Sequence, residues 1–150
     1  MTETNPAIVI GCDHAAYELK EKLKAFLLRN GHAVEDVGAY STESVDYPDY
    51  AKKVASLVSE GRYARGILLC GTGLGMSMAA NRFPGVRAAL CHDLFGATMS
   101  RRHNDANILV MGGRVIGDVL ALEIVKTWLQ TPFEGDRHQR RLDMFDHLSA

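Results

Sequence analysis

Residues 70–75 contain the side chain in this sequence that is best suited to chemistry. They follow the apolar run 66–69 and read Cys70-Gly71-Thr72-Gly73-Leu74-Gly75. A cysteine acts as a base or a nucleophile near neutral pH, and glycines let backbone N–H groups come close to a ligand. N–H groups at the start of a helix also favour negative charge. The segment therefore predicts chemistry on an anionic small molecule. The alternative is a structural strand-to-helix turn that carries an inert, buried thiol.

The glycine spacing does not match the common phosphate-binding loops. A dinucleotide fingerprint needs a glycine where this chain has Met76, and a P-loop ends in Gly-Lys followed by Ser or Thr. Asp93 does lie about 20 residues further on, where dinucleotide-binding proteins place an acidic residue on the ribose. A nucleotide site therefore stays open as an alternative.

Two more groups of titratable residues stand beside predicted strands. Asp13 and His14 directly follow the first strand, where Asp13 is equally suited to cap the next helix. His103 and Asn104 follow the basic pair 101–102 and precede the last strand. A cationic helix C-terminus is stabilising by itself, but the imidazole of His103 also titrates in the range that proton transfer requires.

A third group lies in segment 134–147, which reads as a charged C-terminal helix. Arg137, His138 and Arg141 fall on one side of such a helix. Like charges four residues apart repel by a few tenths of a kcal/mol unless an anion lies between them. The group therefore predicts either a phosphate site or a solvated face with ion pairs to Glu134 and Asp143.

Short β-rich runs alternate with amphipathic segments along the chain. The pattern predicts strands at 7–10, 33–37, 67–70, 86–91 and 108–112, and helices at 16–30, 47–59, 75–82, 94–102 and 116–130. Several of the strands are apolar throughout, which is typical of parallel strands covered on both faces. We therefore expect an α/β fold: a single Rossmann-like, three-layer domain over residues 1–150, with a five-stranded parallel sheet and a C-terminal helix.

In such a sheet, ligands bind beyond the carboxyl ends of the strands. Polar and titratable residues follow most of the predicted strands here, in segments 11–14, 37–40, 70–72, 91–93 and 112–114. We expect these segments to line one crevice.

Composition excludes several classes of protein. The net charge of −1 over 150 residues argues against a general binder of nucleic acid or of membrane surfaces. No apolar run approaches the roughly 20 residues that a membrane span needs, and the start of the chain lacks the features of a signal peptide. Cys12, Cys70 and Cys91 are odd in number and have no metal-knuckle spacing. We therefore expect a cytoplasmic protein without a metal site, in which Cys12 and Cys91 are packing residues.

Several motifs, taken together and in order, resemble one family. They occupy residues 11–16, 46–51, 70–75 with 79–81, 85–89, 100–107 and 112–117. This set closely resembles the type B ribose-5-phosphate isomerases, within the family that includes galactose-6-phosphate isomerase subunits. The resemblance covers nearly the whole chain.

The resemblance implies an aldose–ketose isomerase of carbohydrate metabolism that interconverts ribose 5-phosphate and ribulose 5-phosphate without a cofactor. Cys70 would remove the proton from C2, and Thr72 would move protons between the two substrate oxygens. His103 would protonate the furanose ring oxygen during ring opening, with Asp13 positioning the hydroxyl. Some relatives use a glutamate on the following helix instead, but residues 75–79 contain no acid.

The resemblance also implies binding roles. Backbone N–H groups of residues 71–75 would stabilise the enediolate, as in an oxyanion hole, where one donor is worth about 3 kcal/mol. Asn104 would contact the sugar hydroxyls. Spacing alone would place the phosphate on the glycine loop, whereas the resemblance places it on His14, Arg114, Arg137 and Arg141, with His138 alongside. The remaining substrate-binding residues would be Tyr47, Gly71, Gly73, Leu74 and Gly75.

Relatives place this site between two subunits, so the resemblance implies a homodimer or a dimer of dimers in which residues matching 103–141 come partly from the neighbour. Two alternatives remain. One is an isomerase of another sugar phosphate, such as allose or galactose 6-phosphate or a tetrose 4-phosphate. The other is a non-catalytic module that binds a sugar phosphate or a nucleotide.

Overall fold

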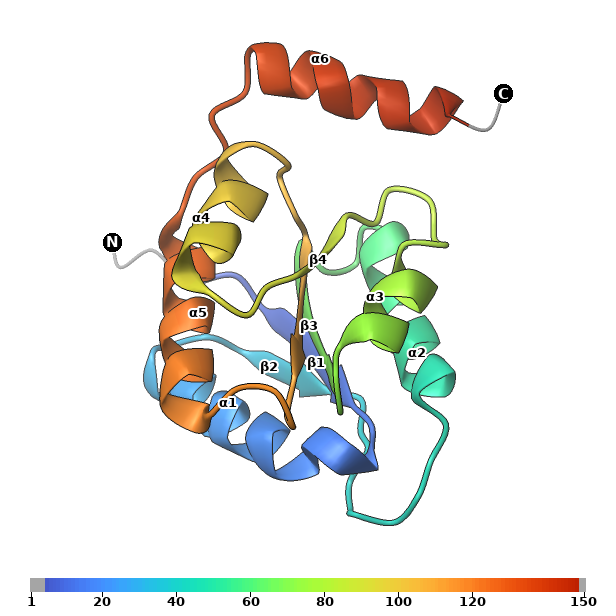
Figure 1. Ribbon diagram of the computed structural model, residues 1–150, viewed down its shortest axis with the longest axis vertical. Coiled ribbons are helices and arrows are strands. Elements are labelled where there is room, and N and C mark those ends of the chain that lie inside the picture. The colour runs from blue at the N-terminus through green and yellow to red at the C-terminus, as the bar shows by residue number, and fades with distance from the viewer. Residues whose placement is uncertain (1–4, 149–150) are drawn as a thin grey trace.

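The computed structural model describes residues 5–148, and its centre is a five-stranded parallel sheet between two layers of helices (Figure 1). Neighbouring strands pair in parallel throughout, in the order β2-β1-β3-β5-β4. The strands are β1 (Ile8–Cys12), β2 (Val34–Asp36), β3 (Arg65–Cys70), β4 (Ala88–Leu90) and β5 (Ile108–Gly112). The predicted α/β fold class is therefore confirmed.

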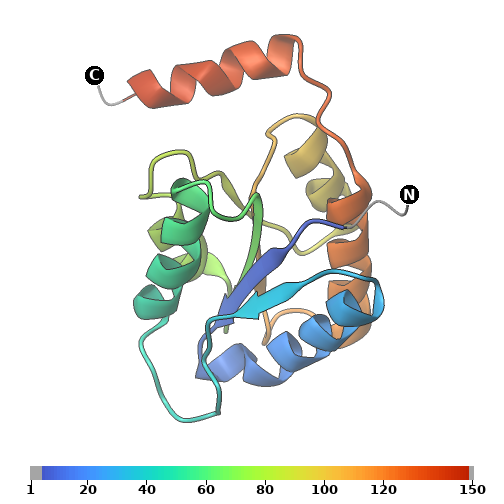
Figure 2. The same cartoon turned by 180° about the vertical axis from the view of Figure 1, so that it is seen from behind.

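Helices cover both faces of this sheet (Figures 1 and 2). One hydrophobic cluster joins one face of the sheet to α1, α4 and α5, and a second cluster joins the other face to α2 and α3. The helices are α1 (Tyr17–Arg29), α2 (Tyr47–Ser59), α3 (Leu74–Ala80), α4 (Leu94–Arg102), α5 (Asp118–Gln130) and α6 (Arg137–Asp143). A 3₁₀ turn at His14–Ala16 precedes α1, and another at Met144–His147 follows α6.

The apolar strands explain the two layers. In β3, Ile67 and Leu69 belong to one cluster while Leu68 and Cys70 belong to the other, because successive side chains of a strand point to opposite faces. All four side chains are buried. A strand covered on both faces has no polar side, which is why it reads as a continuous apolar run.

Strand β4 is shorter than the predicted 86–91. The side-chain oxygen of Asn81 accepts a hydrogen bond from the Ala88 N–H at 2.8 Å, and its amide donates to the Ala88 carbonyl at 3.0 Å. The side-chain oxygen of Asn107 accepts from the Arg87 N–H at 2.8 Å. Side-chain amides therefore replace strand partners at the start of this edge strand.

The C-terminal segment is also shorter as a helix than the predicted 134–147. Gly135 and Asp136 have φ angles of +72° and +50°, in the left-handed region, so α6 begins only at Arg137. After Asp143 the chain continues as the 3₁₀ turn. No helix among residues 5–148 is long and apolar enough to cross a membrane.

The sheet has two opposite edges, one at the end of the strands and one at their start (Figure 1). The strands end at the lower edge in this view, where α1, α3 and α5 begin. Helix α4 runs back against the strands and ends at the upper edge, beside α6. Residues that end a strand and residues that end a helix are therefore placed at opposite edges of the sheet.

Candidate active site

Cys70 is the last residue of β3, and its side chain is 4% exposed. Its Sγ accepts a hydrogen bond from the Gly73 N–H at 3.1 Å. Gly73 adopts φ +80°, and a Cβ there would lie 2.5 Å from the Leu90 side chain. Only glycine therefore fits the turn that aims this N–H at the sulfur, where it stabilises negative charge.

Thr72 packs against the end of β5. A Cβ on Gly112 would lie 2.6 Å from the Thr72 carbonyl carbon, so the glycine permits this contact. The Thr72 Oγ1 accepts a hydrogen bond from the Leu74 N–H at 3.3 Å, which leaves its own hydroxyl hydrogen available to donate. Two of the predicted enediolate donors, Gly73 and Leu74, are thus engaged within the loop. Among residues 5–148, the N–H groups of Gly71 and Gly75 make no hydrogen bond to other backbone or side-chain atoms.

Asp13 and His14 lie beside this loop. The Asp13 N–H donates to the Leu69 carbonyl at 3.1 Å, and its buried carboxylate accepts from the Ala15 N–H at 3.0 Å. The structural cap is therefore confirmed, whereas the catalytic role of Asp13 stays a prediction. His14 Nδ1 accepts from the Val45 N–H at 3.1 Å, so Nε2 carries the ring hydrogen and is a donor.

Arg114 and Tyr47 contact the loop from two further elements. A Cβ on Gly71 would lie 3.6 Å from Arg114 Nη1, and one on Gly75 would meet the end of the Tyr47 ring. The Tyr47 ring therefore packs directly on the backbone at position 75. The side chains that surround residues 70–75 are here called the Cys70 cluster: Asp13, His14, Tyr47, Cys70, Thr72 and Arg114.

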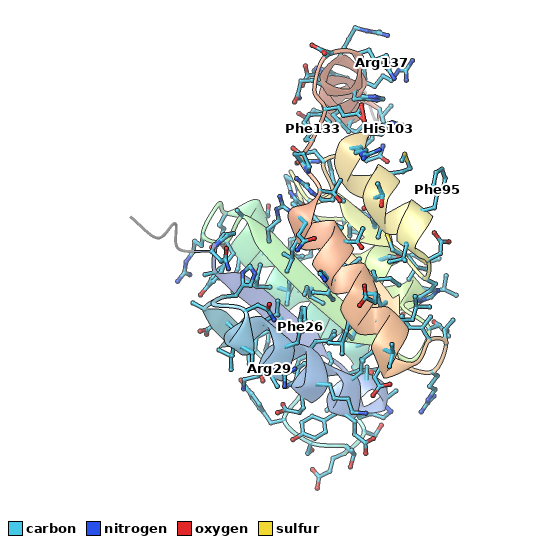
Figure 3. The ribbon with its side chains drawn as sticks, turned by 90° about the vertical axis from the view of Figure 1, so that its left-hand side faces the viewer. Phe26, Arg29, Phe95, His103, Phe133 and Arg137 are labelled. Atoms are coloured by element: carbon cyan, nitrogen blue, oxygen red, sulfur yellow. The ribbon has the colours of Figure 1, made fainter. Side chains whose placement is uncertain are left out.

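The remaining predicted site residues lie at the other edge, around the end of α4 and the start of α6 (Figure 3). The His103 and His138 rings stack with centroids 4.1 Å apart and planes 13° from parallel. His138 is 4% exposed, and its pKa lies below the usual range because burial and the neighbouring His103 and Arg137 oppose its protonation. We call His103, Asn104, Arg137, His138 and Arg141 the His103 cluster.

Residues 137, 138 and 141 lie on one helix as predicted, but they differ in burial. His138 and Leu142 face inward and are buried, whereas Arg137 and Arg141 are exposed. The stacking of His138 on His103 explains this, since it turns the side chain toward α4. Neither arginine forms an ion pair with another residue of the described chain.

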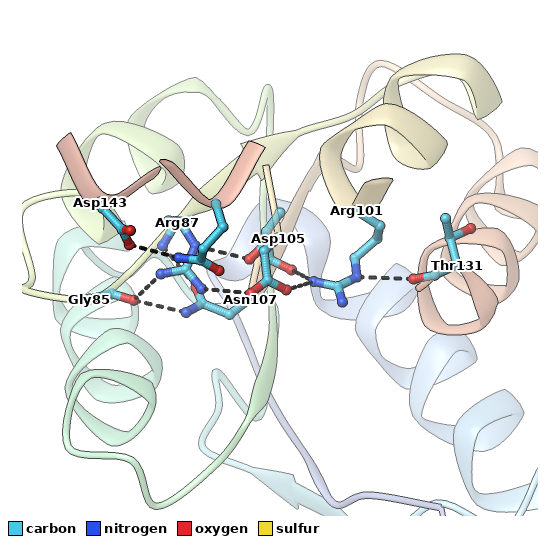
Figure 4. A network of polar contacts seen from close by, with 9 residues as sticks. Gly85, Arg87, Arg101, Asp105, Asn107, Thr131 and Asp143 are labelled. Atoms are coloured by element: carbon cyan, nitrogen blue, oxygen red, sulfur yellow. Dashed lines mark hydrogen bonds and ion pairs between the residues drawn. The ribbon is translucent and has the colours of Figure 1, made fainter. Parts of the chain in front are cut away.

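A network of ion pairs holds the loop that carries His103 and Asn104 (Figure 4). Asp105, at φ +45°, accepts from Arg101 Nη1 at 2.8 Å and pairs with Arg87 Nη2 at 3.4 Å. Arg101 also donates to the carbonyls of Ala106 and Thr131, at 2.7 Å and 3.3 Å. The buried guanidinium therefore ties the loop to the chain that leads into α6. Sequence reasoning missed this network, although the spacing of Arg101 and Asp105 was a usable signal.

The fold also brings together side chains that could hold a metal ion. The sequence shows no ligand spacing for a metal, but ligand atoms of His103, Glu134 and His138 all lie within 4.8 Å of one another. The thiols of Cys12, Cys70 and Cys91 are not part of this group, and all three are free.

A buried thiol, a glycine loop and cationic groups at the carboxyl edge of a parallel sheet are the features of an enzyme that acts on a small anionic substrate. Comparison with known proteins identifies the family. A protein-family model described as Ribose/Galactose Isomerase matches residues 8–145 of this chain. A relative from Escherichia coli, named ribose-5-phosphate isomerase B, is 48% identical over 136 residues and is covered to 91%, as is this chain.

Two further proteins extend the comparison. A crystal structure of a ribose 5-phosphate isomerase from Thermotoga maritima has a TM-score of 0.93 at 58% identity, over 95% of this chain and 99% of that one. A protein from Pectobacterium atrosepticum, named D-erythrulose-4-phosphate isomerase, is 45% identical over 86% of each chain. The chain belongs to the ribose/galactose isomerase family and is an aldose–ketose isomerase of sugar phosphates, which confirms the resemblance seen in its motifs.

Proposed function

We propose that this enzyme interconverts ribose 5-phosphate and ribulose 5-phosphate with Cys70 as the base. The observation that carries the proposal is the Gly73 N–H at 3.1 Å from Sγ, at the carboxyl end of β3. A thiol that must alternate between neutral and anionic forms needs such a donor in a buried site. The names of the Escherichia coli and Thermotoga maritima relatives support the choice of a pentose phosphate.

The chemical step is a proton shift. Cys70 Sγ takes the proton from C2 of the open-chain aldose, and the C–H electron pair forms a C1–C2 double bond while negative charge moves to O1. The N–H groups of Gly71 and Gly75, which make no hydrogen bond within residues 5–148, would stabilise that oxygen. The Thr72 hydroxyl passes a proton from O2 to O1, and the thiol then returns its proton to C1 to give the ketose.

The two clusters lie at opposite edges of the chain, so we propose that a second copy completes the site. In this arrangement the Cys70 cluster of one chain meets the His103 cluster of another. His103 protonates the ring oxygen, and basic residues of both clusters hold the phosphate: His14 and Arg114 from one chain, and Arg137, His138 and Arg141 from the other. Exposed apolar side chains on α3 and α4, beside the edge strand β4, support such an assembly: Leu74, Met78, Leu94 and Phe95. Three unpaired thiols support a reducing compartment such as the cytoplasm.

The protein from Pectobacterium atrosepticum favours a second candidate, isomerisation of a tetrose 4-phosphate. Both reactions use the same proton shift, and they differ in the distance between the phosphate and C2. The discriminating quantity is kcat/KM for aldose phosphates of four, five and six carbons. We expect the pentose phosphate to have the highest value, and a higher value for the tetrose would replace it as substrate.

The Cys70→Ala variant tests the base. We expect it to lose turnover by about a thousandfold or more, since removing a principal acid–base group costs this much, while it still binds the sugar phosphate. Deuterium exchange at C2 should stop along with turnover. Cys91→Ala is the matched control, because Cys91 is an equally buried thiol on the opposite face of the sheet and should leave kcat unchanged. Exchange at the normal rate in Cys70→Ala would exclude the cysteine mechanism.

A further inference from the structure

We propose that His103, Glu134 and His138 form a binding site for a divalent transition-metal ion of the zinc class, and that occupancy of this site switches the isomerase off. Their ligand atoms lie within 4.8 Å of one another. His138 Nε2 is also buried without a hydrogen-bond partner among the described residues. A buried polar atom left without a partner is destabilising, so its presence calls for a ligand or a partner.

The backbone around these residues is held in place. The Glu134 N–H donates to the Arg102 carbonyl at 3.1 Å, which docks the chain before α6 onto the end of α4. The His138 N–H donates to the Gly135 carbonyl at 3.0 Å. The two left-handed residues, Gly135 and Asp136, make the tight turn that brings Glu134 close to His138. The ligand residues therefore start from a fixed backbone, and only side chains need to move.

The donor set suits zinc and similar ions. Two imidazoles with one carboxylate leave a fourth position for water, which is a ligand set known from catalytic zinc sites. Tetrahedral zinc with bonds near 2.1 Å needs ligand atoms about 3.4 Å apart. The three side chains must therefore close in slightly, and the stacked rings must turn because an imidazole lone pair lies in the ring plane. Glu134 is exposed and His103 is half-buried, so both have room to rotate.

Nearby charges modulate the affinity. Glu134 carries the negative charge that attracts a cation, while the exposed Arg137 and Arg141 on α6 oppose one. The inhibitory effect rests on the proposed function, because a His103 nitrogen bound to a metal cannot give its proton to the ring oxygen.

Metal binding is tested without reference to activity. The metal-free protein is titrated with Co²⁺, the visible absorption of the bound ion is recorded, and Zn²⁺ is then added to displace it. We expect one ion per chain. Glu134→Gln removes the carboxylate ligand and should weaken binding at least tenfold. The control is Glu123→Gln, which changes an exposed glutamate on α5 and should leave binding unchanged. Equal binding by the wild type and Glu134→Gln would overturn the site. So would loss of binding in Cys70→Ala, because it would place the ion on the thiol.

Activity is the second measurement. Micromolar Zn²⁺ should inhibit the wild type, a chelator should restore full activity, and Glu134→Gln should keep its metal-free activity but need at least tenfold more Zn²⁺ for inhibition. If Co²⁺ binds through Glu134 yet Zn²⁺ leaves turnover unchanged, the switch and the ring-opening role of His103 are wrong while the site itself stands. If Cys70→Ala retains turnover, the proposed function fails independently of metal binding.

Discussion

The three buried thiols of this protein, Cys12, Cys70 and Cys91, have different surroundings. Burial raises the pKa of Cys12 to about 12, and it also raises the pKa of Cys91. Both side chains therefore stay neutral at physiological pH, as expected for packing residues. The Sγ of Cys70 instead accepts a hydrogen bond from the Gly73 N–H, and its proposed role as the base rests on this contact.

At the same scale, the proposed phosphate contact of Arg137 predicts an effect on substrate binding and little effect on the chemical step. We expect Arg137→Ala to raise KM about ten- to a hundredfold, because a hydrogen bond to a charged group contributes about 1.5–3 kcal/mol. The kcat should stay nearly constant, since the phosphate is held equally in the ground and transition states. Steady-state kinetics on the pentose phosphate measure both constants. Arg140→Ala, which removes the same charge from the same helix, serves as the control; an unchanged KM in Arg137→Ala would remove Arg137 from the phosphate site.

At the scale of elements, a buried ion pair joins α1 to β2. Lys20 is completely buried and donates to both Asp36 carboxylate oxygens, at 2.8 Å and 2.9 Å, and to the Ala39 carbonyl at 2.6 Å. Lys24, which is partly exposed, adds a contact at 3.1 Å. These bonds hold the loop after β2 beside the carboxyl edge. Burial alone would raise the pKa of Asp36, but hydrogen bonds from Lys20, the Gly38 N–H and Lys24 outweigh it and lower the pKa.

This pair predicts a stability change. Lys20→Met should cost about 3–5 kcal/mol of unfolding free energy, since it leaves a buried carboxylate with weaker compensation, whereas Lys24→Met should cost under about 1 kcal/mol. Because the folded pKa of Asp36 lies below its usual 3.8, its contribution is present above that pH and is lost as the pH falls through the folded value. Urea unfolding between neutral and acidic pH measures both effects. Asp36→Asn should lack the part of the acid dependence that Asp36 supplies, and an unaltered acid profile would contradict the assignment.

At the scale of the whole molecule, the direction of α4 separates the predicted site residues into two groups. Residues that follow strands gather at one edge, while the end of α4 and α6 lie at the other (Figure 1). The Cys70 cluster and the His103 cluster of one chain therefore do not face each other. In the proposed assembly, a second copy related by symmetry would bring unlike clusters together twice and give two equivalent sites in a dimer.

Mixing two inactive variants tests this arrangement. Cys70→Ala and His103→Ala should each be inactive as homo-oligomers. After subunit exchange at equal amounts, half of the dimers are mixed and each has one intact site, so about a quarter of the wild-type activity should return. A mixture of Cys70→Ala with Asp13→Ala is the control, because both changes lie in the Cys70 cluster and no intact site can form. Failure of the first mixture to regain activity, with exchange verified by mass, would show that each site is built within one chain.

Features that depend on residues close together in the chain could be predicted from the sequence. The order of strands and helices follows from hydrophobic periodicity, and the Cys70 loop follows from contiguous residues, so both could be expected before the fold was known. The ends of β4 and α6 could not, because Asn81 and Asn107 replace strand partners and Asp136 adopts a left-handed conformation. These competing interactions leave no periodic signal.

The sequence by itself determined the fold class, the family and the candidate base, because each depends on residues adjacent in the chain or on motifs in order. Only the tertiary structure decided which side chains meet. The contacts of Lys20 with Asp36, of Arg87 with Asp105, and of His103 with His138 join residues 16, 18 and 35 positions apart. No spacing rule reaches across such separations, because the path of the intervening strands and helices sets the distance between the two ends.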